Sequence, residues 1–238
     1  MKRVALPSTL KVIEYSAFNE CKNLTHVKLP DGLEKIGARC FYGSGLEEVS
    51  FPDSMKEVGV EAFKGCEQLR DVRLNDGLEK LGEEVVIQGY SYTGGVFVRC
   101  AFESIRLPPA IRRLERYTFC GCKCLKSIDI PNGVEYVGRE CFAGSGIEEI
   151  VFPASVREVG TGAFYECERL KSAELNEGLE KLGVKEPLWG CDYHKGVFTG
   201  SAVKSIKLPS TLKEIDAKAF NGCKDLKRVN IPKGVKRI

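Results

Sequence analysis

The sequence predicts a mostly β solenoid, in which about nine to ten short coils stack along one axis. The first reason is a long repeat: Val-Ala-Leu-Pro at 4–7 returns as Ile-Arg-Leu-Pro at 105–108 and as Ile-Lys-Leu-Pro at 206–209, each time after 101 residues. The second reason is a shorter motif that recurs within each long unit. Short fixed periods are typical of solenoids, because one coil cannot bury its own apolar side and neighbouring coils must stack.

The short motif divides the chain into coils. Successive anchors of the motif lie 23, 22, 23 and 33 residues apart, and the same four steps then repeat. The anchors are Val4, Val27, Val49, Val72, Ile105, Ile128, Ile150, Ala173, Ile206 and Val229. Four coils therefore make one long unit. We expect one solenoid domain over residues 1–238, with units 4–104 and 105–205 and a partial unit 206–238.

Each coil has the same order of elements. An alternating stretch such as 24–29 predicts a half-buried strand, and Pro30 ends it because proline cannot donate to a sheet ladder. Asp-Gly at 31–32 turns the chain, and a second apolar stretch at 33–36 predicts a strand along another side. We expect one buried row of stacked rings from the phenylalanines that follow, which are Phe18, Phe41, Phe63, Phe97, Phe119, Phe142, Phe164, Phe198 and Phe220.

This motif resembles the BspA-like, or Treponema-type, leucine-rich repeats over essentially the whole chain. The run 208–215 reads Leu-Pro-Ser-Thr-Leu-Lys-Glu-Ile, and Ala-Phe-Asn-Gly-Cys follows at 219–223. The resemblance implies a right-handed leucine-rich-repeat superhelix. It also implies an extracellular or cell-surface location, since members are commonly surface or secreted proteins and several are similar to adhesins. The two long coils depart from the pattern, with Asn75 and Asn176 in place of the proline.

Eleven cysteines invite a disulfide or metal interpretation, and the repeat argues against both. Six follow the column phenylalanine by three residues: Cys21, Cys66, Cys100, Cys122, Cys167 and Cys223. We expect them to form a buried row of thiols, because coils two apart are separated by roughly 10 Å, beyond the reach of a disulfide. Cys66, Cys100 and Cys122 lie on successive coils, where pairing would need the right geometry. Cys120, Cys124 and Cys191 lie off the repeat positions, and their spacing is not that of a zinc site.

Composition and charge exclude several classes of function. The net charge is only +3, and 36 cationic and 33 anionic side chains are interspersed, so there is no basic block for nucleic acid. No stretch is long and apolar enough to predict a membrane span. The first residues run straight into a repeat strand and offer no signal-peptide core. Neither end carries a polar capping repeat, which predicts a fragment of a longer solenoid or ends that meet partners.

Motifs for chemistry are nearly absent. The two histidines, His26 and His194, have no histidine 101 residues away, and no nucleophile elbow or phosphate-binding loop is present. We therefore predict no catalytic residues, no cofactor and no metal, and expect the protein not to be an enzyme.

The two long coils carry the candidate binding residues. Both insert their extra residues at the same place in the coil, at 83–95 and 184–196, so both should emerge from the same edge, roughly 20 Å apart. Repeat insertions often map to a binding face, and aromatic residues among glycines are good recognition material. The candidates are Tyr90, Tyr92, Trp189, Tyr193 and His194. In the other interpretation the apolar insert residues fold back and seal the solenoid, and the two can coexist.

These observations favour a non-enzymatic interaction module with a protein partner. Two alternatives stay open. One is glycan binding, with Tyr92, Trp189 and Tyr193 as stacking platforms, and the other is a purely structural spacer. Terminal coils expose unpaired strand edges, so end-to-end self-association is a further expectation.

Overall fold

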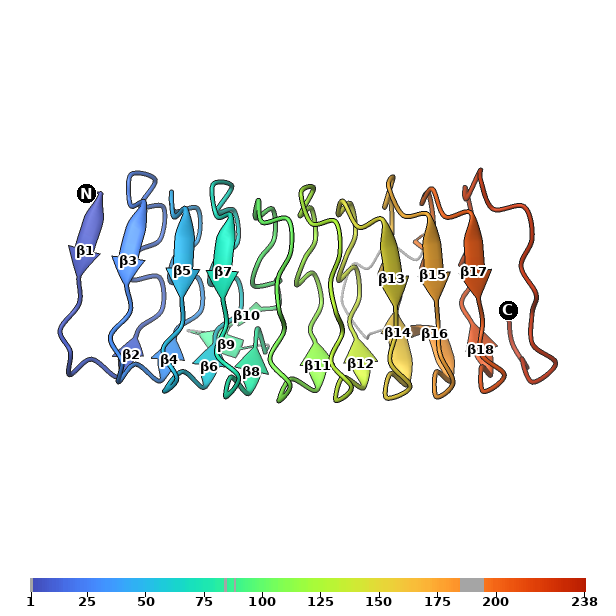
Figure 1. Cartoon of the computed structure of the whole chain (residues 1–238), viewed down its shortest axis with the longest axis horizontal. Helices are drawn as coiled ribbons and strands as arrows, with labels where there is room; N and C mark the ends of the chain where they lie inside the picture. The colour runs from blue at the N-terminus through green and yellow to red at the C-terminus, as the bar shows by residue number, and fades with distance from the viewer. Residues whose placement is uncertain (1, 84, 88, 185–194) are drawn as a thin grey trace.

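The computed structural model describes residues 2–83, 85–87, 89–184 and 195–238. The described part is a β solenoid without a helix, in which the coils follow one another along a single long axis (Figure 1). The predicted solenoid is thus confirmed. No helix that could cross a membrane occurs in these described ranges.

The first row of strands runs through the anchor residues. Each strand pairs in parallel with a counterpart on at least one neighbouring coil, for example Val49 with Val72 and Ile150 with Ala173, and the row is divided into three separate sheets. The strands are β1 (Arg3–Ala5), β3 (His26–Lys28), β5 (Glu48–Ser50), β7 (Asp71–Arg73), β13 (Glu149–Val151), β15 (Ser172–Glu174) and β17 (Ser205–Lys207). A strand in every coil is a wrong prediction, since the coils at Ile105 and Ile128 share only the bridge Arg106–Asp129. Strands of three residues have so few ladder hydrogen bonds that losing one reduces them to a bridge.

The second row consists mostly of two-residue strands on another side of the coils. They are β2 (Val12–Ile13), β4 (Lys35–Ile36), β6 (Glu57–Val58), β8 (Lys80–Leu81), β11 (Arg113–Leu114), β12 (Tyr136–Val137), β14 (Glu158–Gly160), β16 (Lys181–Val184) and β18 (Glu214–Ile215). From β2 to β18 the chain makes eight complete turns, slightly fewer than the nine to ten coils expected, because the first and last coils each add less than a turn.

The second row is interrupted once, between β8 and β11. Here the 33-residue coil places Lys80 and Arg113 at equivalent positions of neighbouring strands. Like charges directly opposite destabilise strand pairing. At the second long coil the corresponding residues are Lys181 and Glu214, which have opposite charges, and β16 pairs with β18.

The predicted phenylalanine row is confirmed on the third side of the coils. Neighbouring rings stack with centroids 5.2–6.1 Å apart and interplanar angles of 6–19°. From Phe18 to Phe198, each column phenylalanine N–H donates to a carbonyl oxygen of the next coil at 2.8–3.0 Å. Because Phe63 donates to Val96 across the first insert and Phe164 to Val197 across the second, both long coils leave this ladder unbroken.

The cysteine row supports the phenylalanine row. Cys66, Cys100, Cys122 and Cys167 are buried, as expected, while Cys21 and Cys223 are partly exposed. From Cys66 on, each of these thiols donates to the carbonyl oxygen of the column phenylalanine on the preceding coil, at 2.9–3.3 Å. The repeat therefore keeps cysteine as a small buried group that also satisfies a backbone acceptor. All ten described cysteines are free.

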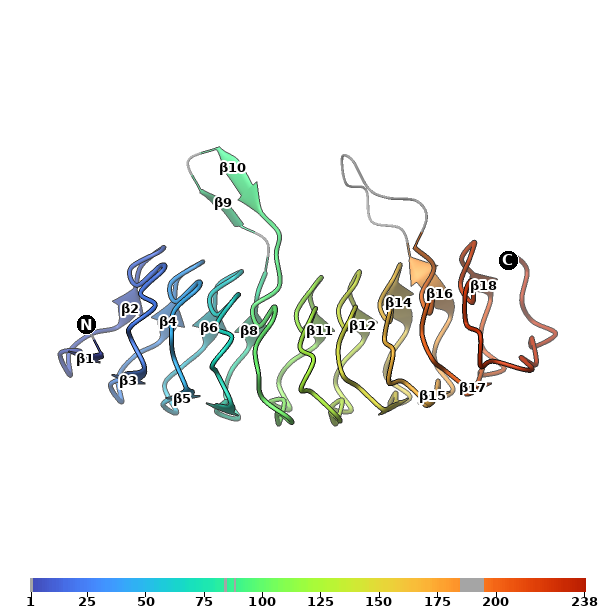
Figure 2. The ribbon, with the colours of Figure 1, turned by 90° about the horizontal axis from the view of Figure 1, so that it is seen from above.

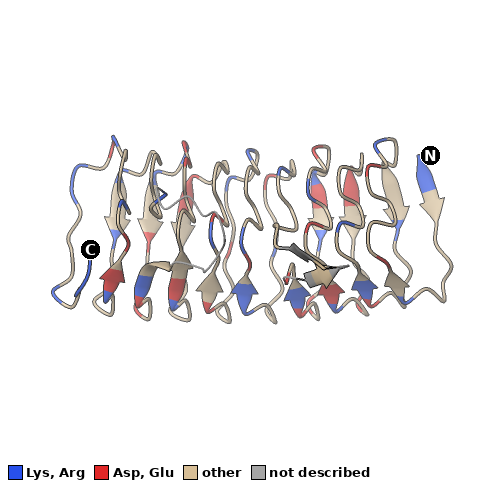
Figure 3. Ribbon diagram, turned by 180° about the vertical axis from the view of Figure 1, so that it is seen from behind, with Lys and Arg blue, Asp and Glu red and all other residues tan. Residues whose placement is uncertain are grey.

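The residues just before the second-row strands alternate in sign, and Figure 3 marks the charged segments along this row in blue and red. The residue just before each strand is, in order, Lys11, Glu34, Lys56, Glu79, Arg112, Glu135, Arg157, Glu180 and Lys213. Neighbours form ion pairs such as Lys11–Glu34 at 3.0 Å and Glu180–Lys213 at 2.7 Å. Because a long unit contains four coils, an even number, the alternation continues without a fault from one unit to the next.

Candidate interaction face on the turn side

The turn face is the outer surface of the segments that carry the column phenylalanines. Two residues after the phenylalanine, the backbone of every coil is left-handed, and glycine occupies six of these nine positions. Glu20, Arg99 and Glu166 are the exceptions, with φ of 56°, 60° and 52°. A side chain at this position leans over the next coil, because a Cβ on Gly121 would lie 3.1 Å from the Arg99 Cγ.

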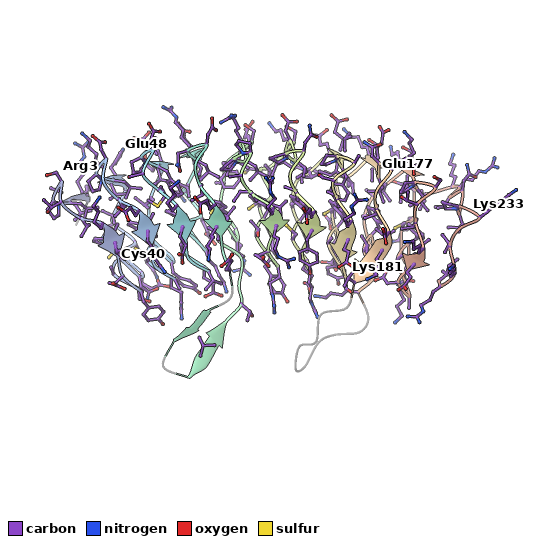
Figure 4. All side chains as sticks on the ribbon, turned by 90° about the horizontal axis from the view of Figure 1, so that it is seen from below. Arg3, Cys40, Glu48, Glu177, Lys181 and Lys233 are labelled. Carbon is purple, nitrogen blue, oxygen red and sulfur yellow. The ribbon has the colours of Figure 1, made fainter. Side chains whose placement is uncertain are left out.

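The first insert forms a hairpin that leaves the solenoid body. Strands β9 (Val85–Ile87) and β10 (Tyr90–Tyr92) pair antiparallel, with Tyr90 opposite Ile87 and Tyr92 opposite Val85. The hairpin rises where the second row meets the turn side (Figure 2) and extends beyond the side chains of the coils (Figure 4). A two-stranded element outside the solenoid body is therefore available to a partner.

Glycines hold the base of the hairpin against the neighbouring coils. A Cβ on Gly94 would lie 2.1 Å from Glu61 Oε1, and one on Gly95 would lie 1.9 Å from the Tyr117 carbonyl oxygen. Real Cβ atoms do not approach backbone this closely, so position 95 needs glycine, whereas a side chain at position 94 would require Glu61 to move. Gly196, at the end of the second insert, stands in the same relation to the Lys218 carbonyl oxygen at 2.1 Å. Both inserts thus return to the body through the same backbone contact.

Between the ends of the two inserts, the turn face is hollowed. The hollow has a volume of about 650 Å³ and spans four coils, with Arg99 at one side and Tyr165 at the other. Its floor is made of small side chains at Cys120, Gly121 and Ala143. Its volume lies in the range of pockets that bind small molecules or single side chains.

A buried carboxylate lies at one wall of the hollow. The side chain of Glu140 is only 9% exposed, and its oxygens accept from Arg139 Nε and Lys195 Nζ, both at 3.0 Å. Lys195 Nζ also lies 4.6 Å from the centroid of the Tyr165 ring. Two cations therefore neutralise Glu140. Burial raises the pKa of the neighbouring Cys120 thiol and the charge of Glu140 adds to this, so the thiol stays protonated at neutral pH.

The first unit fills the corresponding surface with side chains. The guanidinium carbon of Arg39 lies 4.4 Å from the Tyr42 ring centroid. Lys64 lies 5.7 Å from the same ring and donates to Glu61 at 2.7 Å. No group of three or more His, Cys, Asp or Glu in the described ranges could hold a metal ion.

The sequence matches the BspA type leucine rich repeat region, in six copies, over residues 1–93, 91–186 and 193–238. The chain belongs to the BspA-type leucine-rich repeat family. A comparison with curated proteins finds no match.

Two solved structures share the architecture of this BspA-type chain. A leucine-rich repeat protein from Bacteroides ovatus is 26% identical, with a TM-score of 0.66, and the match covers 98% of this chain and 67% of that one. A leucine rich cell surface protein from Faecalibacterium prausnitzii is 19% identical, with a TM-score of 0.63, over 99% of this chain and 76% of that one. The second likeness concerns the fold alone.

The structure places only part of the predicted binding residues of this BspA-type chain. Tyr90 and Tyr92 lie on β10, where the backbone alone is described. Trp189, Tyr193 and His194 lie outside the described residues. Their role as a ligand-binding set stays a prediction.

Sequence reasoning missed the hollow, although a signal for it was present. Cys120 and Cys124 fall off the repeat positions, and both line the hollow. The residue after the column phenylalanine is Cys120 and Ala143 in the two middle coils. In the three preceding coils it is Tyr42, Lys64 and Val98, and in the next coil it is Tyr165. Aligning the coils position by position, instead of searching for motifs along the chain, would have revealed these small residues where other coils have larger side chains.

Proposed function

We propose that this chain is a non-enzymatic protein-interaction module of a surface or secreted adhesin-like protein. The observation that carries the proposal is the β9–β10 hairpin, which projects from an otherwise regular stack and has Tyr90 and Tyr92 on one strand. Trp189, Tyr193 and His194 of the second insert would complete the contact surface. Tyrosine and tryptophan supply large, rigid contact areas at protein interfaces.

The proposed surface location is supported by a fold relative. The structurally similar protein from Faecalibacterium prausnitzii is described as a cell surface protein. A stiff stack of coils also suits this setting, since its regular core positions an insert without itself needing to contact the ligand.

The test compares insert variants against an array of secreted and surface proteins and against a glycan array. Deleting 83–93 or 184–194 shortens each long coil by 11 residues, to the 22-residue spacing found elsewhere in the chain. We expect binding to a protein, with an affinity that falls at least about tenfold when either insert is shortened. Tyr90→Ser with Tyr92→Ser is the matched control that keeps the insert length.

Two outcomes would contradict the proposal. Unchanged affinity in both shortened variants would place the partner elsewhere on the solenoid. Hits on the glycan array alone, with quenching of Trp189 fluorescence, would support the carbohydrate alternative.

A further inference from the structure

We propose that the hollow on the turn face binds an aromatic side chain of a partner protein, with tyrosine as the reference occupant. The inference rests on the proposed function in so far as the partner is a protein. The hollow is a different surface from the insert tips, because it lies on the body of the solenoid. It is lined mainly by the coils that carry Phe97, Phe119, Phe142 and Phe164.

The internal repeat indicates which side chain fits. In the first unit, Glu20 and Tyr42 occupy the positions that Gly121 and Ala143 hold 101 residues later. Two side chains, a carboxylate and a phenol ring, are therefore missing from the second unit at equivalent places of the same scaffold.

Glycine geometry shows that the space of the missing carboxylate is open beside Gly144. A Cβ on Gly43 would lie 2.8 Å from the Glu20 carboxylate, whereas a Cβ on its counterpart Gly144 would meet nothing within 4 Å. In the first unit Tyr42 itself lies against this surface, with Arg39 4.4 Å from its ring centroid. In the first unit the chain thus places its own tyrosine ring on this surface, whereas the second unit has only Ala143 there.

The walls of the hollow have the chemistry that an aromatic ring prefers. Tyr165, whose ring centroid lies 4.6 Å from Lys195 Nζ, contributes an aromatic wall, and Cys100 and Cys120 also line the hollow. Arg99 leans over Gly121, and within the described ranges its side chain forms no hydrogen bond or ion pair, so its guanidinium can stack on a ring.

Arg99 is held in a backbone conformation that disfavours it. Its φ is 60°, and its counterpart 101 residues on is Gly200, with φ of 72°. A non-glycine residue in this region is strained, and such strain clusters at functional sites. The position thus carries a cation at the edge of the hollow, where six of the nine coils carry glycine and two others carry Glu20 and Glu166.

The same walls disfavour a cationic occupant. Arg139 and Lys195 already neutralise Glu140, so its buried carboxylate is not available to an incoming cation. Burying an unpaired charge costs far more than burying a ring.

The test is a titration of the full chain with N-acetyl-tyrosinamide, followed by amide chemical shifts, with N-acetyl-leucinamide as the apolar control. We expect shifts at Gly121, Ala143 and Gly144, with a dissociation constant of millimolar order. Ala143→Tyr installs the ring of the first unit and should abolish the shifts. Arg99→Gly, which relieves the backbone, should keep the fold and weaken binding roughly two- to fivefold.

A gain-of-function variant provides the matched control. Tyr42→Ala with Glu20→Gly should open a second hollow in the first unit, seen as new tyrosinamide shifts at Gly43 and Gly65. Shifts that persist unchanged in Ala143→Tyr, or equal binding of the leucine and tyrosine amides, would overturn the inference. If the tyrosinamide fails to bind while shortened inserts still lose the protein partner, the inference fails and the proposed function stands.

Discussion

At the scale of single residues, the contacts of the thiols explain why cysteine recurs at one position of the coil. Cys122 lies fully buried, and its Sγ donates to the Phe97 carbonyl oxygen at 2.9 Å. Serine occupies the same repeat position in three coils, at Ser44, Ser145 and Ser201. The position therefore needs a small donor, and disulfide or metal chemistry plays no part in this account.

Replacing Cys122 should separate the requirement for a small side chain from the requirement for a hydrogen-bond donor. Cys122→Ala leaves the Phe97 carbonyl without its donor and should lower the free energy of unfolding by about 1–3 kcal/mol. Cys122→Ser keeps a donor and should cost less. Urea denaturation measures both, and the exposed Cys124→Ser is the control with no expected effect. Equal losses in the alanine and serine variants would contradict the role of the hydrogen bond.

The buried thiols also predict a pH dependence of stability. Burial raises the pKa of Cys66 to about 11 and those of Cys40 and Cys167 to about 12, from 9.0 in the unfolded chain. Above pH 9 the unfolded chain loses these protons while the folded chain keeps them. The stability contributed by the neutral thiols is therefore complete below pH 9 and declines toward pH 11–12, by roughly 1.4 kcal/mol per pH unit for each thiol.

Cys66→Ser isolates this effect, because it removes one thiol from the row. Between pH 9 and 10.5, the free energy of unfolding of this variant should fall less steeply than that of the parent chain. Identical slopes in denaturation curves at each pH would show that Cys66 titrates normally in the folded state.

At the scale of elements, the phenylalanine row links coils that have very short strands. Phe142 stacks on Phe119 and on Phe164, at 5.4 Å in both cases, and is fully buried. Phe18 has one stacked neighbour, Phe41, and is partly exposed. Strands of two or three residues contribute little alone, so the ring stack supplies much of the contact between coils.

Phe142→Ala should lower the free energy of unfolding by about 3–5 kcal/mol, because it leaves a cavity between two rings. Phe18→Ala should cost less than half as much. Chemical denaturation of both variants provides the comparison. Similar losses at the two positions would contradict a stack that depends on both neighbours.

The alternating charges of the second row yield a prediction that depends on salt. Glu180 pairs with Lys213 at 2.7 Å, and Arg157 lies on the other side of it in the sequence of charges. Glu180→Lys would place three cations in succession and should lower the thermal midpoint at low salt. The loss should shrink in 0.5 M NaCl, because salt screens exposed charges. A loss independent of salt would point to packing instead.

The sequence predicted the repeated features well because repetition averages out local ambiguity. The anchors, the phenylalanine row and the cysteine row each recur in many coils, and their burial follows from stacking. The missing strands at Ile105 and Ile128 could not be predicted, because they depend on a few hydrogen bonds after a long coil. The hollow escaped sequence reasoning because it consists of absent side chains at Gly121 and Ala143, which form no motif.

At the scale of the whole molecule, the solenoid separates support from recognition. The repeated core makes a rigid stack, and the features that break the repeat gather on the turn side: the β9–β10 hairpin, the end of the second insert at Lys195 and the hollow between them. The exposed side of the second row is instead covered by alternating charges. End-to-end association of the coils stays a prediction.

Hydrogen–deuterium exchange of the chain, alone and bound to the partner found on the array, tests this separation most directly. The account predicts new protection in the first insert, at 85–95, and in the turn segments at 98–101, 120–124 and 140–144. Protection confined to the first-row strands β5, β7, β13 and β15, with the turn side exchanging as in the free chain, would contradict it.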